Sequence, residues 1–505
     1  METKERALKK VTAELEKSIK ALVTESRKCG LGELIFFFHT LHFMRLIPKR
    51  DDLPDDQREA ITMIAQATDE ACKYIVQCVV KYGYKQFLFT SNRMVIDGER
   101  CQEMLKRATA INSVFEMLYF IKRIGKVEVS GVRDQEIKMN IEELADWSTE
   151  VGKFWLYGAR VDKNTMLKKS GISKDDILDR FRKEYREIEH LFIKVFEVSL
   201  DEFINLLDGL MTTVATSVDK AFPITDTEEI DMQLYGNILN FGRCYLLDKD
   251  ELIGRLSVKE RGALNLLIFE PGKFDEHELR FNRLARQPLF QVGSNLIVSP
   301  ELILDSISLN THFSMLEASE IHEEYKTIAS GKFLDKIASV LARHGYAEIY
   351  REYDLFEGKN QIGDIDIGFK NDAGRVILVE AKNHFLPLEV HFRDTDAVKS
   401  RLMALQNDWE KKVKKRNDHL RNNFNGYSLP ENFEYIIITR SPEVLTHFSE
   451  FKVFDLYELD RYLADFSSLT SVEEIITKIY GLDEEEAKKH DLSQLDYFTP
   501  GIYLH

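Results

Sequence analysis

The chain has 505 residues, of which 44% are hydrophobic and 30% are charged, and its formal net charge is −16. This composition is typical of a soluble globular protein, and the length predicts two to four domains. Because the chain is acidic overall, any contact with nucleic acid would have to be local and sensitive to salt.

Several features predict a cytoplasmic protein. The longest apolar run, residues 34–44, is short and is interrupted by His39, Thr40 and His42, so we expect no membrane span. We interpret the two histidines as core or helix-face residues. The first ten residues lack the apolar core of a signal peptide. Five cysteines without a CxxC spacing favour a reducing compartment and argue against structural zinc.

The N-terminal part, residues 1–222, is predicted to be a large all-α module. No proline occurs between Asp55 and Phe222, and apolar residues recur at helical spacing. The clearest helix follows a capping sequence at residues 173–176 and is expected to end near Gly209. Its apolar positions are Ile177, Phe181, Tyr185, Ile188, Leu191, Phe192 and Val195.

A smaller mixed segment, residues 223–316, is expected to connect the helical module to the rest of the chain. Pro223 and the acidic run centred on residues 226–231 mark the boundary. Residues 288–300 contain two short apolar runs on either side of Gly293-Ser294-Asn295, which predicts a small hairpin with a turn at these three residues.

The most informative stretch is residues 362–382. Two β-type runs, 362–370 and 375–382, flank a turn cluster at 371–374, so the segment is predicted to be a β-hairpin. Side chains alternate between the two faces of a strand. Asp364 and Asp366 therefore share one face of the first strand, and Glu380 and Lys382 share one face of the second. Folding the hairpin brings Asp366 to within about one residue of Glu380.

Two acids at the end of an otherwise apolar strand are costly unless something binds them. Mg²⁺ prefers carboxylate oxygens, and Asp366, Glu380 and the backbone carbonyl of Ala381 would be its ligands. Mn²⁺ would be expected to substitute. Lys382 would orient or deprotonate a water and offset charge on a phosphate. The alternative is a solvated ion pair at the end of a hairpin. His384 and His391 flank this candidate site.

The motifs Gly363-Asp364-Ile365-Asp366 and Val379-Glu380-Ala381-Lys382 resemble those of the PD-(D/E)xK, or restriction-endonuclease-like, nuclease superfamily. The nearest likeness is to the branch of Holliday-junction resolvases and nuclease-related domains. Residues 331–335 match its first element, with Leu for Phe and Asp for Glu. The resemblance implies that Asp366, Glu380, Lys382 and Asp335 are catalytic. Asp364, which shares a strand face with Asp366, would be a second metal ligand or a residue that contacts a metal ligand.

The order of expected elements agrees with this resemblance. A helix around residues 334–344 precedes a strand at 347–356, the hairpin, a long helix at 395–424 and a strand at 433–439. The resemblance implies an αβββαβ nuclease domain over residues 317–470, followed by a C-terminal helix and tail at 471–505. The fold class is therefore multidomain, α plus α/β.

The long helix is locally basic. Between Lys399 and Arg421 there are eight basic and three acidic residues, a balance of +5. This predicts contacts with a nucleic-acid backbone, and the alternative is a solvated helix face. Members of the superfamily that the motifs resemble often have a substrate-facing polar residue early in this helix. The resemblance therefore suggests that Lys399 or Gln406 faces the substrate. Trp409 is interpreted as core packing.

These features predict a Mg²⁺-dependent DNA endonuclease, most simply in prokaryotic restriction or antiphage defence. A homo-oligomer and a partner protein bound through the helical region are expected by analogy. Two rival interpretations are a non-catalytic scaffold that binds nucleic acid or protein, and an RNA-cleaving effector switched on by a ligand or partner.

Overall fold

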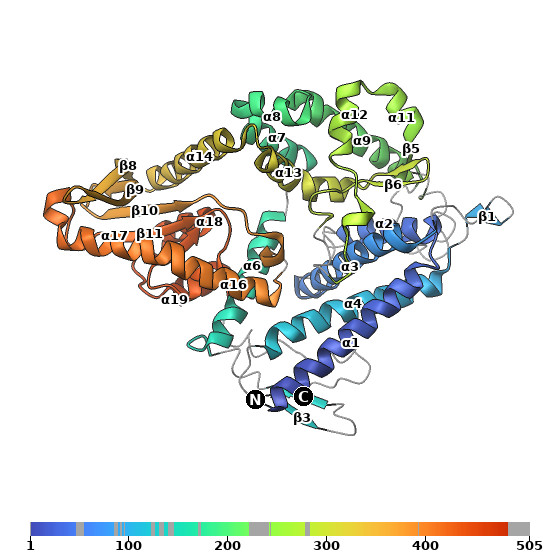
Figure 1. Ribbon diagram of the computed structural model, residues 1–505, viewed down its shortest axis with the longest axis horizontal. Coiled ribbons are helices and arrows are strands. Elements are labelled where there is room, and N and C mark those ends of the chain that lie inside the picture. The colour runs from blue at the N-terminus through green and yellow to red at the C-terminus, as the bar shows by residue number, and fades with distance from the viewer. Residues whose placement is uncertain are drawn as a thin grey trace.

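A computed structural model describes most of the chain (Figure 1). The described residues are 2–46, 55–84, 89–90, 93–94, 96–122, 127–130, 136–139, 146–169, 173–221, 242, 244–277, 283–391 and 393–482. The protein is mixed helix and sheet, with a helical N-terminal region and a five-stranded sheet nearer the C-terminus. None of the helices in these ranges combines the length and apolar character needed to cross a bilayer.

The N-terminal region begins with the helices α1 to α4, with α1 beside α4 and α2 beside α3 (Figure 1). Their bounds are α1 Glu2–Ser26, α2 Leu31–Leu46, α3 Asp55–Tyr82 and α4 Gly98–Ile121. The region is not purely helical as expected, because it also contains two small antiparallel sheets. These pair β1 (Phe89–Thr90) with β2 (Arg93–Met94) and β3 (Val127–Ser130) with β4 (Glu136–Met139).

The helix predicted from residue 177 onward is divided into three. Ser173 and Asp176 form the expected capping box in front of α7 (Lys174–Tyr185). A 3-10 turn at Arg186–Ile188 leads to α8 (Glu189–Phe196), and α9 covers Leu200–Ala221. The predicted end near Gly209 is wrong, because Glu197 takes a left-handed conformation (φ 60°) and ends α8 there. The break lets aromatic side chains of α7, α8 and α9 pack together.

The connecting segment contains a three-stranded antiparallel sheet in the order β5-β7-β6. The hairpin expected around Gly293 is present, and Gly293 adopts a positive φ (61°) in its turn. Pro223 and the acidic run at 226–231 lie outside the described residues. The elements are β5 Leu246–Asp248, α11 Lys249–Arg255, α12 Val258–Asn265, β6 Phe290–Val292, β7 Asn295–Ile297 and α13 Pro300–Glu317.

The C-terminal region has a five-stranded sheet in the order β12-β11-β10-β9-β8. β8, β9 and β10 are antiparallel, whereas β10, β11 and β12 run parallel. The strands are β8 Tyr346–Glu357, β9 Asn360–Asn371, β10 Val376–Lys382, β11 Glu434–Thr439 and β12 Lys452–Asp455. The helices are α14 His322–Arg343, α15 Leu388–His391, α16 Thr395–Leu405, α17 Lys411–Asn422, α18 Leu456–Arg461 and α19 Val472–Tyr480.

Helices cover both faces of this sheet, α14 on one side and α16 with α17 on the other (Figure 1). The alternation of β10 explains the two layers, since Ile377 and Val379 pack toward α14 while Val376 and Leu378 pack toward α17. The helix expected at 395–424 is continuous in path but contains a π-turn at Gln406–Glu410. The tail beyond residue 482 lies outside the described residues.

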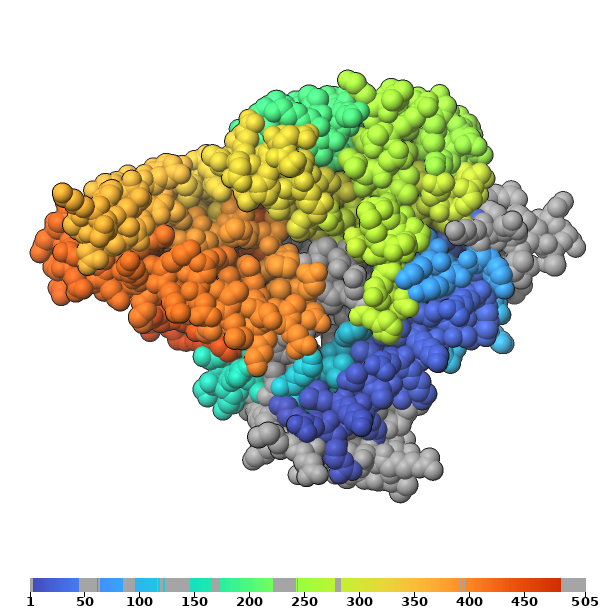
Figure 2. All heavy atoms as spheres, viewed as in Figure 1, coloured from blue at the N-terminus to red at the C-terminus, as the bar shows by residue number. Residues whose placement is uncertain are grey.

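Helix α6 (Glu150–Lys169) departs from the domain division expected from the sequence. Its Phe154 and Tyr157 belong to the same apolar cluster as α16 and α17. Its Asn164 donates to the Asp455 carboxylate (2.9 Å) and to the Tyr480 hydroxyl (2.8 Å). In Figure 2 the residues of the C-terminal region, orange to red, form one continuous body. Helix α6 precedes the boundary expected at residue 222, yet it packs on the C-terminal region.

Candidate functional site

The hairpin of β9 and β10 brings the predicted acids together at its open end. The antiparallel ladder runs from Val376 opposite Lys370 to Val379 opposite Ile367. At the next step Asp366 and Glu380 would stand opposite each other, as the sequence predicted. Regular pairing gives way there to a side-chain bond, in which the backbone N–H of Ala381 donates to the Asp366 carboxylate (2.6 Å). Asp366 is thereby fixed against the backbone of the neighbouring strand.

Glu380 lies at the centre of the cluster and is only 1% exposed. Its Oε1 accepts from Lys382 Nζ at 2.6 Å. Its Oε2 pairs with the guanidinium of Arg416 from α17 and accepts from the Tyr435 hydroxyl at 3.3 Å. A buried carboxylate is tolerated only when it is paired and hydrogen-bonded, and these contacts meet that requirement.

Asp366 is compensated less well. Burial and the neighbouring Glu380 carboxylate raise the pKa of Asp366 to about 7, although the Ala381 N–H and Lys382 oppose the shift. Two carboxylates in one buried place repel each other, and a bound cation relieves that repulsion. The donor set, two carboxylates beside the backbone of Ala381, therefore fits a hard divalent cation of the Mg²⁺ type.

Lys382 is held between Glu380 and an aromatic ring. Its Nζ lies 5.8 Å from the centroid of the Trp409 ring, and Arg401 faces the same ring at 5.0 Å. Trp409 is buried, as expected of a core residue, and His384 stacks on it with a 5.6 Å separation of centroids. Trp409 belongs to the π-turn Gln406–Glu410, and π-turns inside helices are frequent at functional sites. The side chain of His391 lies outside the described residues.

Asp335, which the sequence placed in the site, makes no contact with Asp366, Glu380 or Lys382 among the described residues. Its side chain is 69% exposed on α14 and pairs with Arg351 of β8 at 2.9 Å. The physical reason is its phase on the helix, because Leu334 and Ile337 occupy the buried stripe and Asp335 lies off that stripe. The Asp364 carboxylate lies 3.4 Å from Arg416, which in turn pairs with Glu380, so Asp364 is linked to the cluster through that guanidinium.

Lys399 and Gln406, expected to face a substrate, are separated along the long helix. Lys399 is exposed on α16, and the half-buried Gln406 begins the π-turn. Among the described residues neither contacts Asp366, Glu380 or Lys382, so the structure gives them no direct part in the cluster.

Arg416 and Tyr435 are the members of the cluster that the sequence reasoning missed. Arg416 was counted only as one of eight basic residues, and Tyr435 only as part of a buried strand. One signal was present, since Arg416 follows the core residue Trp409 by two helical turns and therefore shares its buried face. That spacing would have separated Arg416 from the solvated lysines around it.

The basic stretch is largely compensated within the protein. Four of its eight cations pair with carboxylates: Arg401 with Glu443, Lys412 with Asp408, Lys414 with Glu450, and Arg416 with Glu380. Arg421 donates to the carbonyls of Glu431 and Phe433. The net positive charge available to an outside partner is therefore smaller than the sequence count indicates.

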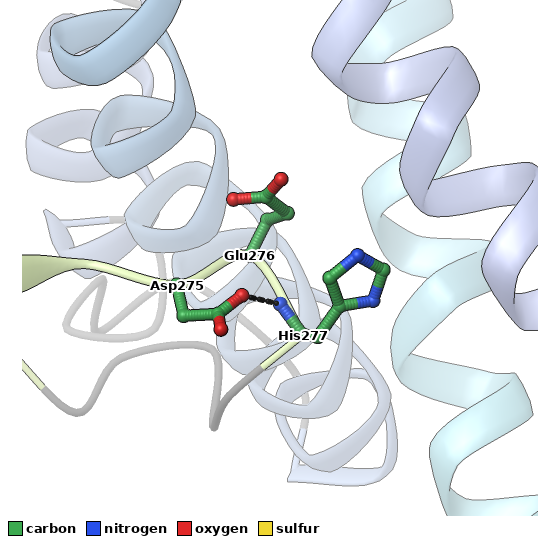
Figure 3. Close-up of side chains that lie close together, drawn as sticks. All are labelled: Asp275, Glu276 and His277. Carbon is green, nitrogen blue, oxygen red and sulfur yellow. Dashed lines mark hydrogen bonds between the residues drawn. The ribbon is translucent and has the colours of Figure 1, made fainter.

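A second group with metal-ligand chemistry lies on the loop after Phe274. Figure 3 shows Asp275, Glu276 and His277, whose candidate ligand atoms lie within 4.8 Å of one another. The Asp275 carboxylate accepts from the backbone N–H of His277 at 2.9 Å. Glu276 is committed to α3, because it accepts from the Tyr82 hydroxyl and from Lys81 at 3.2 Å. The carboxylates of Asp275 and Glu276 are thus both engaged within the protein.

Comparison with known proteins does not identify a function for the site. No family model matches the chain, and neither curated proteins nor solved structures show significant similarity to it. The function is therefore argued from the geometry and chemistry of the residues around Glu380.

Proposed function

We propose that this protein is a metal-dependent hydrolase of phosphodiester bonds and that it acts as an endonuclease on DNA. The observation that carries the proposal is the meeting of Asp366 and Glu380 at the end of a hairpin, with Lys382 bound to Glu380. The order of α14, three antiparallel strands, a long helix and a parallel strand is the order expected of restriction-endonuclease-like nucleases, and it supports the proposal.

Each residue has a distinct part in this proposal. Asp366 and Glu380 would hold the cation together with the carbonyl of Ala381. A divalent cation supplies Lewis acidity and lowers the pKa of a coordinated water. The Lys382 ammonium group would orient the attacking water and offset the negative charge that develops on the phosphate. The Trp409 ring, whose centroid lies 5.8 Å from that ammonium group, would add a weak cation–π attraction.

Cleavage assays with the purified full-length chain test the proposal. Supercoiled plasmid, linear duplex, single-stranded DNA and RNA are incubated with Mg²⁺, Mn²⁺ or EDTA. We expect nicking and linearisation of plasmid only with the metals. Asp366→Asn and Lys382→Ala should each lower the rate by roughly 10²–10⁴-fold.

Asp335→Asn is the matched control, because it removes an acid that is exposed and paired with Arg351 away from the cluster. It should cleave like the unaltered chain. Equal loss of activity in Asp335→Asn and Asp366→Asn would contradict the assigned site. Cleavage of RNA alone would favour the RNA-cleaving effector.

A second function is favoured by one observation. Both oxygens of Glu380 already have cationic partners, Lys382 and Arg416, which is the arrangement of a structural ion cluster. A protein of this kind would bind nucleic acid without cutting it. Gel-shift assays beside the cleavage assays separate the two, since a scaffold retards DNA in every variant and cleaves it in none.

A further inference from the structure

Arg416 bridges two acids at the candidate site. Its side chain enters from α17 and is nine-tenths buried, with 9% exposure. One guanidinium nitrogen pairs with Oε2 of Glu380, and the other lies 3.4 Å from Oδ1 of Asp364. The guanidinium therefore links two carboxylates from adjacent strands, β9 and β10.

Gly363 makes room for this bridge. A Cβ atom at position 363 would lie 2.2 Å from Arg416 Nε and 2.9 Å from Cζ, so any side chain there would push the guanidinium away from its present place. Gly363 also has φ +139°, a conformation open to glycine. Thus the glycine of the Gly-Asp-Ile-Asp motif has a physical reason, which is the close approach of the Arg416 side chain.

The bridge uses the oxygens that a second metal ion would need. In two-metal phosphodiesterases the ions lie about 3.5–4 Å apart and share carboxylates. Here Oε2 of Glu380 and Oδ1 of Asp364 are engaged by the guanidinium. The Asp366 carboxylate is free of a cationic hydrogen-bond partner among the described contacts, in which it accepts from the Ala381 N–H.

We propose that Arg416 is a positioning residue that serves as a built-in second cation, so that the site takes a single divalent ion between Asp366 and Glu380. This inference rests on the proposed function. It predicts that the number of bound metal ions, and not only the rate, depends on a cationic side chain from position 416 lying between Glu380 and Asp364.

Counting bound Mn²⁺ tests the inference without relying on activity. Electron paramagnetic resonance and equilibrium dialysis are applied to the full-length chain, to Arg416→Met and to Arg416→Lys. We expect one Mn²⁺ per chain in the unaltered protein, two in Arg416→Met and one in Arg416→Lys. Arg421→Met is the matched control, because Arg421 lies on the same helix and donates only to backbone carbonyls in the described contacts. It should bind one ion.

Gly363→Ala provides a second route if Arg416→Met does not fold. It displaces the guanidinium while keeping its charge, and it too should admit a second Mn²⁺. Two ions in the unaltered chain, or one ion with unchanged affinity in Arg416→Met, would overturn the inference and leave the proposed function standing. No Mn²⁺ bound by the unaltered chain would overturn both.

Discussion

Arg160 of α6 and Glu458 of α18 form a fully buried, two-point ion pair although they lie 298 residues apart in the chain. Both side chains are 0% exposed, and two nitrogens of Arg160 each approach a different Glu458 oxygen at 2.5 Å. The remaining terminal nitrogen donates to the Glu443 carbonyl at 3.0 Å. This pair joins α6, a helix of the N-terminal half, to α18, the helix that follows β12 of the five-stranded sheet.

Breaking that pair should destabilise the protein strongly. Arg160→Met leaves Glu458 charged, buried and without its main partner, which costs roughly 3–5 kcal/mol. Urea unfolding followed by circular dichroism measures the loss. Arg186→Met is the exposed control, because Arg186 pairs with Asp201 at the surface, and it should cost less than about 1 kcal/mol.

The double variant Arg160→Met/Glu458→Met separates loss of the ion pair from loss of packing. Removing both charges should restore much of the stability, since well-packed apolar residues replace buried pairs at little cost. A double variant less stable than Arg160→Met alone would contradict this account.

Metal binding should strengthen as the pH rises from 6 to 8. The pKa of Asp366 is raised to about 7 by burial and by Glu380, so its carboxyl retains a proton that the unfolded chain has lost between about pH 4 and 7. In the metal-free protein this group therefore contributes less to stability as the pH rises through that window. A cation binds the ionised form, so binding releases the proton.

Thermal unfolding with and without Mg²⁺ at pH 6 and pH 8 measures this linkage. The rise in Tm caused by Mg²⁺ should be larger at pH 8. Asp366→Asn should remove the difference between the two pH values. An equal Mg²⁺ effect at both pH values in the unaltered chain would exclude Asp366 as the titrating ligand.

Lys382 should act on the rate and not on metal binding. Lys382→Ala removes the ammonium group 2.6 Å from Glu380, so we expect cleavage to fall by roughly 10²–10⁴-fold while Mn²⁺ remains bound. Lys399→Ala removes an exposed lysine of α16 away from the cluster, and with saturating DNA it should change the rate less than about twofold, because one phosphate contact affects binding and not the chemical step. Loss of Mn²⁺ binding in Lys382→Ala would indicate a structural role for the lysine.

The salt dependence of DNA binding should depend on the lysines that have no carboxylate partner. Lys399 and Lys415 are exposed and have no ion-pair partner among the described residues, whereas Lys414 pairs with Glu450 at 2.6 Å. Each phosphate contact removed should flatten the slope of log K against log salt by roughly 0.9. Fluorescence anisotropy at several salt concentrations should show this for Lys399→Ala/Lys415→Ala and a smaller change for Lys414→Ala. The same slope in all proteins would place the DNA contact elsewhere.

The sequence by itself determined the order of the C-terminal helices and strands and the meeting of Asp366 with Glu380. Both follow from local rules, because alternation of apolar residues defines strands and a short turn fixes the register of a hairpin. The hairpin at Gly293 and the capping box at Ser173 were predictable for the same reason.

Only the tertiary structure decided which distant groups join the site. Asp335 belongs to residues 331–335, which match the first element of the resembled family. Its position on α14 nevertheless directs its side chain outward, where it pairs with Arg351. Arg416 reaches Glu380, 36 residues away, because α17 crosses the sheet at the gap left by Gly363. The docking of α6 through Arg160 depends on a partner 298 residues away. Local pattern fixes the elements, but the position of one element against another follows from packing that no short window contains.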